Sequence, residues 1–125
     1  MKLQLAATDY GNMLQNEPSP LATSTIAEKC TERLVEDFQY IRSNASGDLV
    51  RFLDYMTYQY MIDNVILLIT GTLHARDTHE LLDRCHPLGM FEGMAALCVA
   101  TNVAELYNLV LVDTPIGTLP LLVAI

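Results

Sequence analysis

Hydrophobic side chains recur at helical spacing along residues 25–44. They stand three or four positions apart and so share one face of an α-helix, at Ile26, Cys30, Leu34, Phe38 and Ile41. Arg33 and Asp37 are spaced to pair across one turn of that helix. Thr25, with Glu28 three positions later, has the form of a capping box. The pattern therefore predicts a helix that begins at Thr25 and ends near residue 44.

A second, longer helix is predicted from Asp48 to about His74. The residues that share its main stripe are Leu49, Phe52, Leu53, Met56, Tyr60, Asn64 and Leu67. From residue 61 to residue 70 the pattern is apolar on nearly every side, which is typical of a helix enclosed by other elements. β-branched residues are frequent over residues 65–72, so a strand is the alternative there. The uninterrupted helical pattern that precedes them favours a helix.

Shorter elements follow the second helix. A short helix is predicted after Asp77 or Thr78, either of which can cap it, with Leu81 and Leu82 facing inward. The proline-containing run at residues 85–89 ends this helix.

Two further short helices are expected near the end of the chain, over residues 91–100 and 103–111. Thr101 or Asn102 is expected to cap the second, and the Asp-Thr-Pro run at 113–115 to end it. Residues 116–125 are apolar and carry Gly117 and Pro120, and no structure is predicted for them.

The connecting segments are short. Residues 8–12 indicate a turn, residues 16–20 with two prolines indicate a loop, and Ser46-Gly47 indicates the turn between the long helices. Residues 2–7 are too short for an independent helix and are interpreted as the end of an earlier element. No Gly/Ser linker divides the chain. The predicted fold class is all-α, an antiparallel helix bundle.

Composition and charge then limit the function. Hydrophobic residues make up 51% of the 125 residues and charged residues 18%, which is typical of a folded domain. The formal net charge is −8, and no basic cluster is present. Nucleic-acid binding needs Lys and Arg to neutralise phosphates, so it is excluded, and docking on an anionic membrane is disfavoured. A basic protein partner fits this charge, although the charge could equally serve solubility alone.

The compartment is indicated by the cysteines and by the apolar runs. Cys30, Cys85 and Cys98 are an odd number without paired spacing, which fits a reducing compartment and no disulfide framework. The longest apolar run, residues 65–69, is far below the roughly 20 residues of a membrane span. No secretory signal opens the chain. We therefore expect a buried soluble helix and no membrane span.

Metal and nucleophile sites are the first candidates for chemistry. His74, His79, Cys85 and His86 lie close in sequence, but His74 and His79 diverge on a helix, and adjacent Cys85 and His86 rarely bind one ion. Because side chains of adjacent residues seldom meet, Cys85 and His86 are not expected to form a reactive thiolate pair. Cys30 and Cys98 fall at core spacing and are predicted to be small buried hydrophobes. We expect no metal ion and no catalytic cysteine.

Carboxylates and glycines are the next candidates. Glu28, Glu32, Glu36 and Asp37 form an acidic ridge, which on an amphipathic helix is usually the solvated face. The three isolated glycines form no phosphate-binding loop with a lysine; they are Gly71, Gly89 and Gly93. We expect no nucleotide, no other cofactor and no small-molecule substrate.

Asp63 is the carboxylate that the pattern places in apolar surroundings. A buried carboxylate needs a partner, and the candidates are a helix end, Arg51 or Arg76. A proton relay is the functional alternative. Because no span is present, a structural hydrogen bond is the preferred interpretation.

Five runs of sequence resemble the subunit d family of V-type proton ATPases. The longest is YMIDNVILLITGTLH at residues 60–74, and it is highly specific. The others are ATDYG with NEPSPL at 7–11 and 16–21, CHPLG at 85–89, AELYN at 104–108 and LVDTP at 111–115. The resemblance extends from about residue 3 to residue 116.

The resemblance implies a non-catalytic subunit of the V0 sector. A member of this family is a funnel of three similar helical domains on the cytoplasmic face of vacuolar or endosomal membranes. It joins the proteolipid c-ring to the central shaft and couples ATP hydrolysis to proton transport. Residues 1–115 would be part of such a helical domain, and residues 116–125 an apolar tail that departs from the family pattern. The alternative is an acidic helical adaptor of another complex.

Overall fold

The computed structural model describes residues 2–99, 103–106, 108 and 112–118. These residues form helices, turns and irregular segments without a strand, which confirms the all-α fold class. The chain divides into two compact units, Met1–Ser46 and Gly47–Ile125. None of the described helices combines the length and the hydrophobicity that crossing a bilayer requires.

The first unit contains α1 (Lys2–Leu5), α2 (Gly11–Leu14) and α3 (Thr23–Asn44). The Thr8 hydroxyl donates to the Leu5 carbonyl at 2.6 Å and so ends α1. Residues 2–7, interpreted as the end of an earlier element, therefore hold a short helix. The turn predicted at residues 8–12 runs directly into α2, which the sequence pattern missed. Four residues are too few to show a helical period.

Glycine and leucine determine how α2 packs. A Cβ atom at Gly11 would lie 2.6 Å from the Ala6 carbonyl oxygen, so only glycine allows this close approach. Leu14 at the end of α2 is 1% exposed and is the buried hydrophobic residue of the unit. The loop predicted at residues 16–20 is confirmed, because no helix lies there.

Helix α3 differs from its prediction at its start and on its apolar face. Its N-cap is Ala22, which makes no side-chain cap bond, so the cap predicted at Thr25 is wrong. The first turn already forms before Thr25, since the Ile26 N–H donates to the Ala22 carbonyl at 3.2 Å. The predicted end near residue 44 is confirmed. The expected core face is not buried: Cys30 and Leu34 are exposed.

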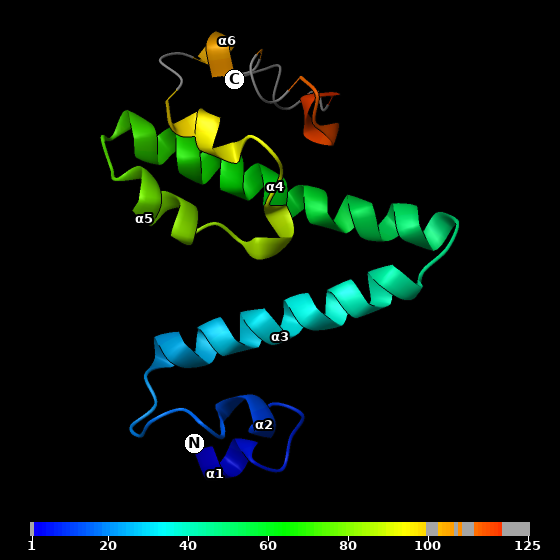
Figure 1. The fold of residues 1–125 in the computed structure, drawn as a ribbon, viewed down its shortest axis with the longest axis vertical. Helices are drawn as coiled ribbons and strands as arrows, with labels where there is room; N and C mark the ends of the chain where they lie inside the picture. The colour runs from blue at the N-terminus through cyan, green and yellow to red at the C-terminus, as the bar shows by residue number, and fades with distance from the viewer. Residues whose placement is uncertain (1, 100–102, 107, 109–111, 119–125) are drawn as a thin grey trace. The chain divides into compact units, whose positions relative to one another are not determined.

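The second unit is built on the 26-residue helix α4 (Asp48–Leu73), as predicted. Helix α5 (Thr78–Asp83) turns back and lies beside the C-terminal half of α4 (Figure 1). The 3-10 helices η1 (Pro87–Gly89), η2 (Met94–Cys98) and η4 (Pro115–Thr118) also pack on α4. Helix α6 (Val103–Leu106) lies between η2 and η4 in sequence.

One hydrophobic core joins α4, α5, η2 and η4. Its buried members are Met61, Val65, Leu68, Leu81, Cys85, Met94, Leu97 and Ile116. Burial at this level stabilises the fold by about 25 cal/mol per Å² of apolar surface removed from water. Ile116, in the tail for which no structure was predicted, is 0% exposed and belongs to this core.

The buried face of α4 is not the stripe that the sequence indicated. Leu53 and Asn64 are buried, but Leu49, Phe52 and Met56 are 47–60% exposed. In the C-terminal half, Met61, Val65 and Leu68 are members of the core. Enclosure of residues 61–70 is incomplete, since Ile66 is 47% exposed.

The short elements were predicted with mixed success. Asp77 caps α5, because its Oδ1 accepts the Glu80 N–H at 3.0 Å, and Leu81 faces inward. The helix predicted over 91–100 is the shorter 3-10 helix η2, which begins after Gly93 in the left-handed region at φ 84°. The helix predicted over 103–111 is described only as α6. The expected caps Thr101 and Asn102 lie outside the described residues.

Candidate functional site

The most specific polar arrangement of the second unit joins α4 to η1. Asn64 is 2% exposed, and its side chain reaches the backbone of His86. Its Oδ1 accepts the His86 N–H at 2.7 Å, and its Nδ2 donates to the His86 carbonyl at 2.9 Å. One amide thus satisfies both backbone groups of a residue 22 positions away. A buried polar group costs free energy unless it is paired, and here both partners are paired.

The side chain of His86 makes two further contacts, with Tyr60 and with the backbone of Leu88. The imidazole stacks on Tyr60 with ring centroids 4.0 Å apart and an interplanar angle of 21°. Its Nδ1 accepts the Leu88 N–H at 3.2 Å and so caps η1. A nitrogen that accepts carries no proton, so this geometry requires the neutral ring with its hydrogen on Nε2. Burial lowers the pKa of His86 below its usual value of 6.5.

Gly89 completes this joint by its lack of a side chain. A Cβ atom there would lie 2.3 Å from the Tyr60 carbonyl oxygen and 2.6 Å from Asn64 Nδ2. The backbone of η1 therefore lies directly on α4, and no larger residue fits without moving a main chain. We call the set Tyr60, Asn64, His86 and Gly89 the α4–η1 joint. It connects α4 to η1 through hydrogen bonds, a ring stack and a close approach of the two main chains.

The adjacent Cys85 and His86 do not act as a pair. The Cys85 thiol is buried and donates to the Leu81 carbonyl at 3.4 Å, while the His86 ring bonds to the Leu88 N–H. A thiol held in this way is structural, because nucleophilic cysteines need an accessible thiolate beside a base. This geometry supports the sequence interpretation that Cys85 is not catalytic.

The other metal candidates lie on separate hydrogen bonds within their own segments. His74 Nδ1 lies 2.7 Å from the Thr70 carbonyl, and His79 Nδ1 lies 3.2 Å from Asp83 Oδ2. In the described part of the chain, His, Cys, Asp and Glu side chains form no group of three that could hold a metal ion. The expectation of no metal ion remains a prediction for the whole chain.

The expectation for Asp63 is wrong. Its side chain is exposed and accepts a hydrogen bond from Gln59 Nε2 at 3.1 Å, one turn earlier on α4. Arg51 instead lies 3.9 Å from Asp48, and Arg76 pairs with Glu80. Since successive helical residues point about 100° apart, Asp63 turns to solvent where its neighbour Asn64 turns inward. The buried polar group of this segment is the amide.

Glycines in the second unit serve packing. A Cβ atom at Gly71 would lie 2.3 Å from Leu81 Cδ2, so glycine allows α5 to approach α4. Gly89 serves η1 in the same way, and Gly93 turns the chain into η2. These three glycines thus serve close packing or the direction of the chain.

The acidic ridge of α3 carries ion pairs. Arg33 pairs with Asp37, as predicted, with Nη2 3.0 Å from Oδ1. Lys29 lies 2.8 Å from Glu32 and 3.7 Å from Glu17, and the hydrogen bond to Glu32 is the main cause that raises its pKa. A cavity of about 330 Å³ lies between α2 and α3, and its lining includes both cations. Because these cations already bond to carboxylates, the ridge resembles an ordinary solvated face.

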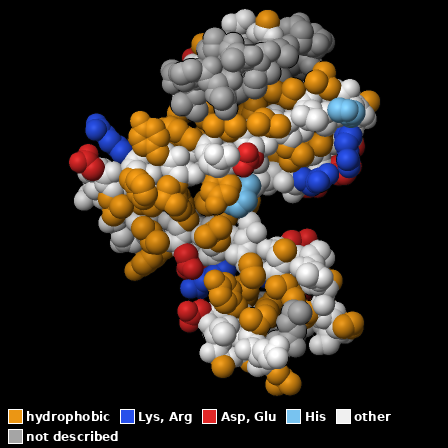
Figure 2. All heavy atoms as spheres, turned by 180° about the vertical axis from the view of Figure 1, so that it is seen from behind, with side chains coloured by type: hydrophobic (Ala, Val, Ile, Leu, Met, Phe, Trp, Pro, Cys, Tyr) orange, Lys and Arg blue, Asp and Glu red, His pale blue; other side chains and the backbone are white. Residues whose placement is uncertain are grey.

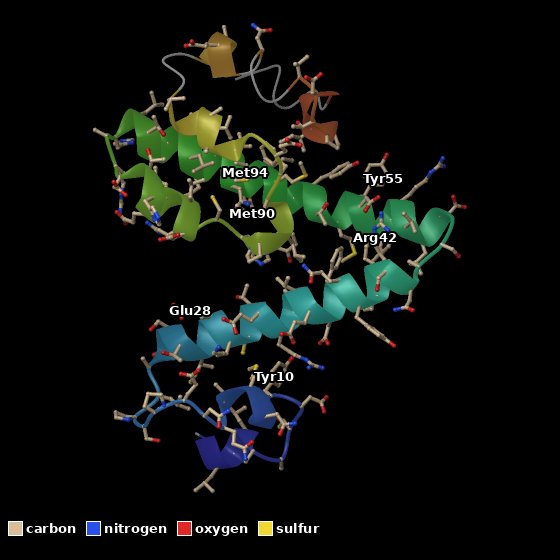
Figure 3. The ribbon with its side chains drawn as sticks, in the orientation of Figure 1. Tyr10, Glu28, Arg42, Tyr55, Met90 and Met94 are labelled. Carbon is tan, nitrogen blue, oxygen red and sulfur yellow. The ribbon has the colours of Figure 1, made fainter. Side chains whose placement is uncertain are left out.

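Exposed hydrophobic side chains mark both long helices. Figure 2 shows them on the surface of each unit. On α4 they cover the N-terminal half, where Phe52 is 60% and Tyr55 67% exposed. Tyr55, labelled in Figure 3, packs edge-on against Tyr58 with ring centroids 5.2 Å apart. On α3 Tyr40 is 73% exposed. Grouped apolar exposure of this kind is typical of surfaces that contact other protein.

Asn64 and Gly89 lie in the two runs, 60–74 and 85–89, that resemble the family, but the sequence analysis gave neither residue a structural role. The signal for Asn64 was a polar residue at helical spacing between Tyr60 and Leu68. For Gly89 it was a glycine two residues after a proline. Its close approach to Tyr60 depends on tertiary packing, which no local pattern shows.

Comparison with known proteins identifies the relatives of this chain. The family model described as ATP synthase (C/AC39) subunit matches residues 1–120. The "Probable V-type proton ATPase subunit d" of Oryza sativa subsp. japonica is 59% identical over 117 residues, covering 94% of this chain and 33% of that protein. The "V-type proton ATPase subunit d" of Neurospora crassa is 60% identical over 117 residues, which cover 94% of this chain and 32% of that protein. The Saccharomyces cerevisiae "V-type proton ATPase subunit d" is 54% identical over 118 residues, 94% of this chain and 34% of that protein. The chain thus spans about a third of the length of these relatives.

Proposed function

The chain belongs to the ATP synthase (C/AC39) subunit family, and we propose that it is part of a subunit d of the V0 sector of a V-type proton ATPase. The observation that carries this proposal is identity of 54–60% with three relatives of that name over 94% of the chain. The α4–η1 joint uses residues from the two runs, 60–74 and 85–89, on which the resemblance rests.

In this role the chain performs no chemistry of its own. It contributes to the connection between the central shaft and the proteolipid c-ring, on the cytoplasmic face of vacuolar or endosomal membranes. Torque from ATP hydrolysis passes through the complete subunit to the ring and drives proton transport. The paired hydrogen bonds of Asn64 with His86 suit this role, because close-packed protein interiors transmit strain. Its partners are the c-ring and shaft subunits, and no nucleic acid or small molecule takes part.

The domain organisation belongs to the same proposal. Residues 1–115 form part of one helical domain of a larger helical funnel. Residues 116–125 are an apolar tail, and the family model still covers residues 116–120 of it. Ile116 anchors the start of this tail in the core.

A chimera tests the proposal. The 118 aligned residues of the Saccharomyces cerevisiae relative are replaced by this chain, and the chimera is expressed in cells that lack the native subunit. We expect vacuoles from these cells to acidify on ATP addition, measured by quenching of a pH-sensitive dye. A tagged chimera should co-purify with the c-ring and the shaft subunits.

The controls are the unmodified relative and a version that lacks the aligned segment. A chimera that is present at the normal level but pulls down neither ring nor shaft would contradict the proposal. An acidic adaptor of another complex would give that result.

A further inference from the structure

A pocket outside the α4–η1 joint lies between the segments that flank η2 and η4. It has a volume of about 390 Å³ and is lined by Phe91, Glu92, Gly93, Ala96, Asp113, Thr114 and Pro115. Both walls are anchored in the core of the second unit. Met94 and Leu97 of η2 are 3% and 0% exposed, and Ile116 of η4 is 0% exposed. The pocket is therefore part of the folded unit.

The two carboxylates of this pocket have no cation near them in sequence. All seven Lys and Arg residues stand at or before Arg84, so none follows in residues 85–125. Glu92 and Asp113 are both exposed, and the ion pairs of the described residues do not include either of them. The acids of α3 and α5 differ, because Glu32 and Asp37 each bond to a Lys or Arg of α3, and Glu80 bonds to Arg76 just before α5.

The remaining lining is apolar and includes one aromatic ring. Phe91 is half-buried and is fixed by the bond from its N–H to Met94 Sδ at 3.3 Å. Ala96 and Pro115 add aliphatic surface. Two uncompensated carboxylates above an aromatic and aliphatic lining suit a side chain with an apolar stem and a cationic end.

We propose that this pocket is a docking site for an arginine side chain of a partner protein. The guanidinium group presents its donors in a planar fork that can bond to carboxylates in pairs, and its flat face stacks on aromatic rings. A lysine would supply charge without the planar contact to Phe91. The chain's net charge of −8 steers a basic partner toward this site. The pocket concerns recognition alone, so it can be tested without assembly of a proton pump.

The test is a titration of the 125-residue chain, followed by the NMR shifts of its backbone amides. The probes are a capped Ala-Arg-Ala peptide and the same peptide with citrulline, which has the shape of arginine without its charge. We expect the arginine peptide to shift the amides of Gly93, Ala96 and Thr114. The citrulline peptide should bind about tenfold more weakly.

Matched variants separate the pocket from the overall charge. Glu92→Gln with Asp113→Asn removes two charges from the pocket, and Glu28→Gln with Glu36→Gln removes two from α3. All four side chains are exposed, so both double variants are expected to keep the fold, as far-UV circular dichroism can show. The pocket variant should lose about tenfold in affinity for the arginine peptide, and the α3 variant should bind as the unaltered chain does. Equal binding of arginine and citrulline, or equal losses in the two variants, would overturn the proposal.

Discussion

Asn64 on α4 holds His86 before η1 by both backbone groups of that residue, at 2.7 and 2.9 Å. The side-chain amide offers one donor and one acceptor side by side. It therefore bonds to both the carbonyl and the N–H of one residue, as a neighbouring strand does in a β-sheet. The connection spans 22 residues of sequence, so it forms only when the segment after α5 has folded back on α4. The joint therefore depends on one side chain, and its loss should be measurable.

Removing that amide is the first prediction. Asn64→Ala leaves the N–H and the carbonyl of His86 buried without partners, and each lost bond of this kind costs about 1–3 kcal/mol. We expect the free energy of unfolding to fall by about 2–4 kcal/mol, measured by urea denaturation followed by circular dichroism.

The neighbouring residue provides the control for this change. Asp63 is exposed, and its bond to Gln59 lies on the helix surface. Asp63→Ala should therefore change the free energy of unfolding by less than about 0.5 kcal/mol. Equal losses in the two variants would mean that the burial assigned to Asn64 is wrong.

Gly89 gives the second prediction. In Gly89→Ala the new methyl group meets the Tyr60 carbonyl, a main-chain atom that cannot move without disturbing α4. We expect a loss of about 2 kcal/mol or more in the free energy of unfolding, in the upper range for overpacking. Gly71→Ala makes a comparable contact with the end of the Leu81 side chain, which can rotate, and it gains about 1 kcal/mol of helix propensity. Thermal melts should therefore rank Gly89→Ala as clearly the more damaging, and the reverse order would contradict this account.

The end of α4 gives a prediction of opposite sign. Ala75 follows the C-cap His74 and adopts φ 54°, and the Arg76 N–H donates to the Gly71 carbonyl at 3.0 Å to close the turn. The left-handed region costs an L-residue about 1 kcal/mol, and glycine avoids this cost. Ala75→Gly should raise the free energy of unfolding by about 0.5–1 kcal/mol.

The matched control for Ala75 lies at the end of α3. Ala45 also follows a long helix, but its φ is −80°, which any residue adopts. Ala45→Gly should therefore bring no gain and a small loss, because glycine adds entropy to the unfolded chain. Equal gains at the two positions, in denaturant titrations of the two variants, would show that backbone strain at Ala75 is not the cause.

The helices and the site differ in how far the sequence could predict them. Both long helices follow from periodicity, because their amphipathic and apolar patterns extend over many turns. The helix caps and the buried faces do not follow from periodicity. Thr25 satisfies the capping rule, yet α3 begins earlier, at Thr23. Asp63 was predicted to be buried, whereas its neighbour Asn64 is the buried residue, and this error has the same origin. Local pattern gives the period of α4, but which face is covered depends on α5, η1 and η2, which contact it from up to 30 or so residues away in sequence.

The joint also predicts a dependence of stability on pH. His86 Nδ1 accepts the Leu88 N–H, and burial lowers the pKa of the ring below 6.5. The folded chain therefore holds a proton on this ring less readily than the unfolded chain does. It follows that the contribution of the neutral ring is fully present above pH 6.5. It is lost as the pH falls through 6.5 toward the lower pKa of the folded state, below which the loss is complete. The ring faces Tyr60, and desolvation is the cause of the shift.

The measurement compares the free energy of unfolding at pH 7.5 and pH 5 in three chains. In His86→Asn the side-chain oxygen can still accept the Leu88 N–H but does not titrate, so the loss of stability on acidification should be smaller than in the unaltered chain. His79→Asn removes an exposed histidine that pairs with Asp83 on the surface. This variant should still lose the stability that the neutral His86 ring contributes when the pH falls. Because the His86 variant and the unaltered chain share every other titrating group, the difference between them isolates one ring. If that difference is absent, the imidazole is not held neutral by the joint.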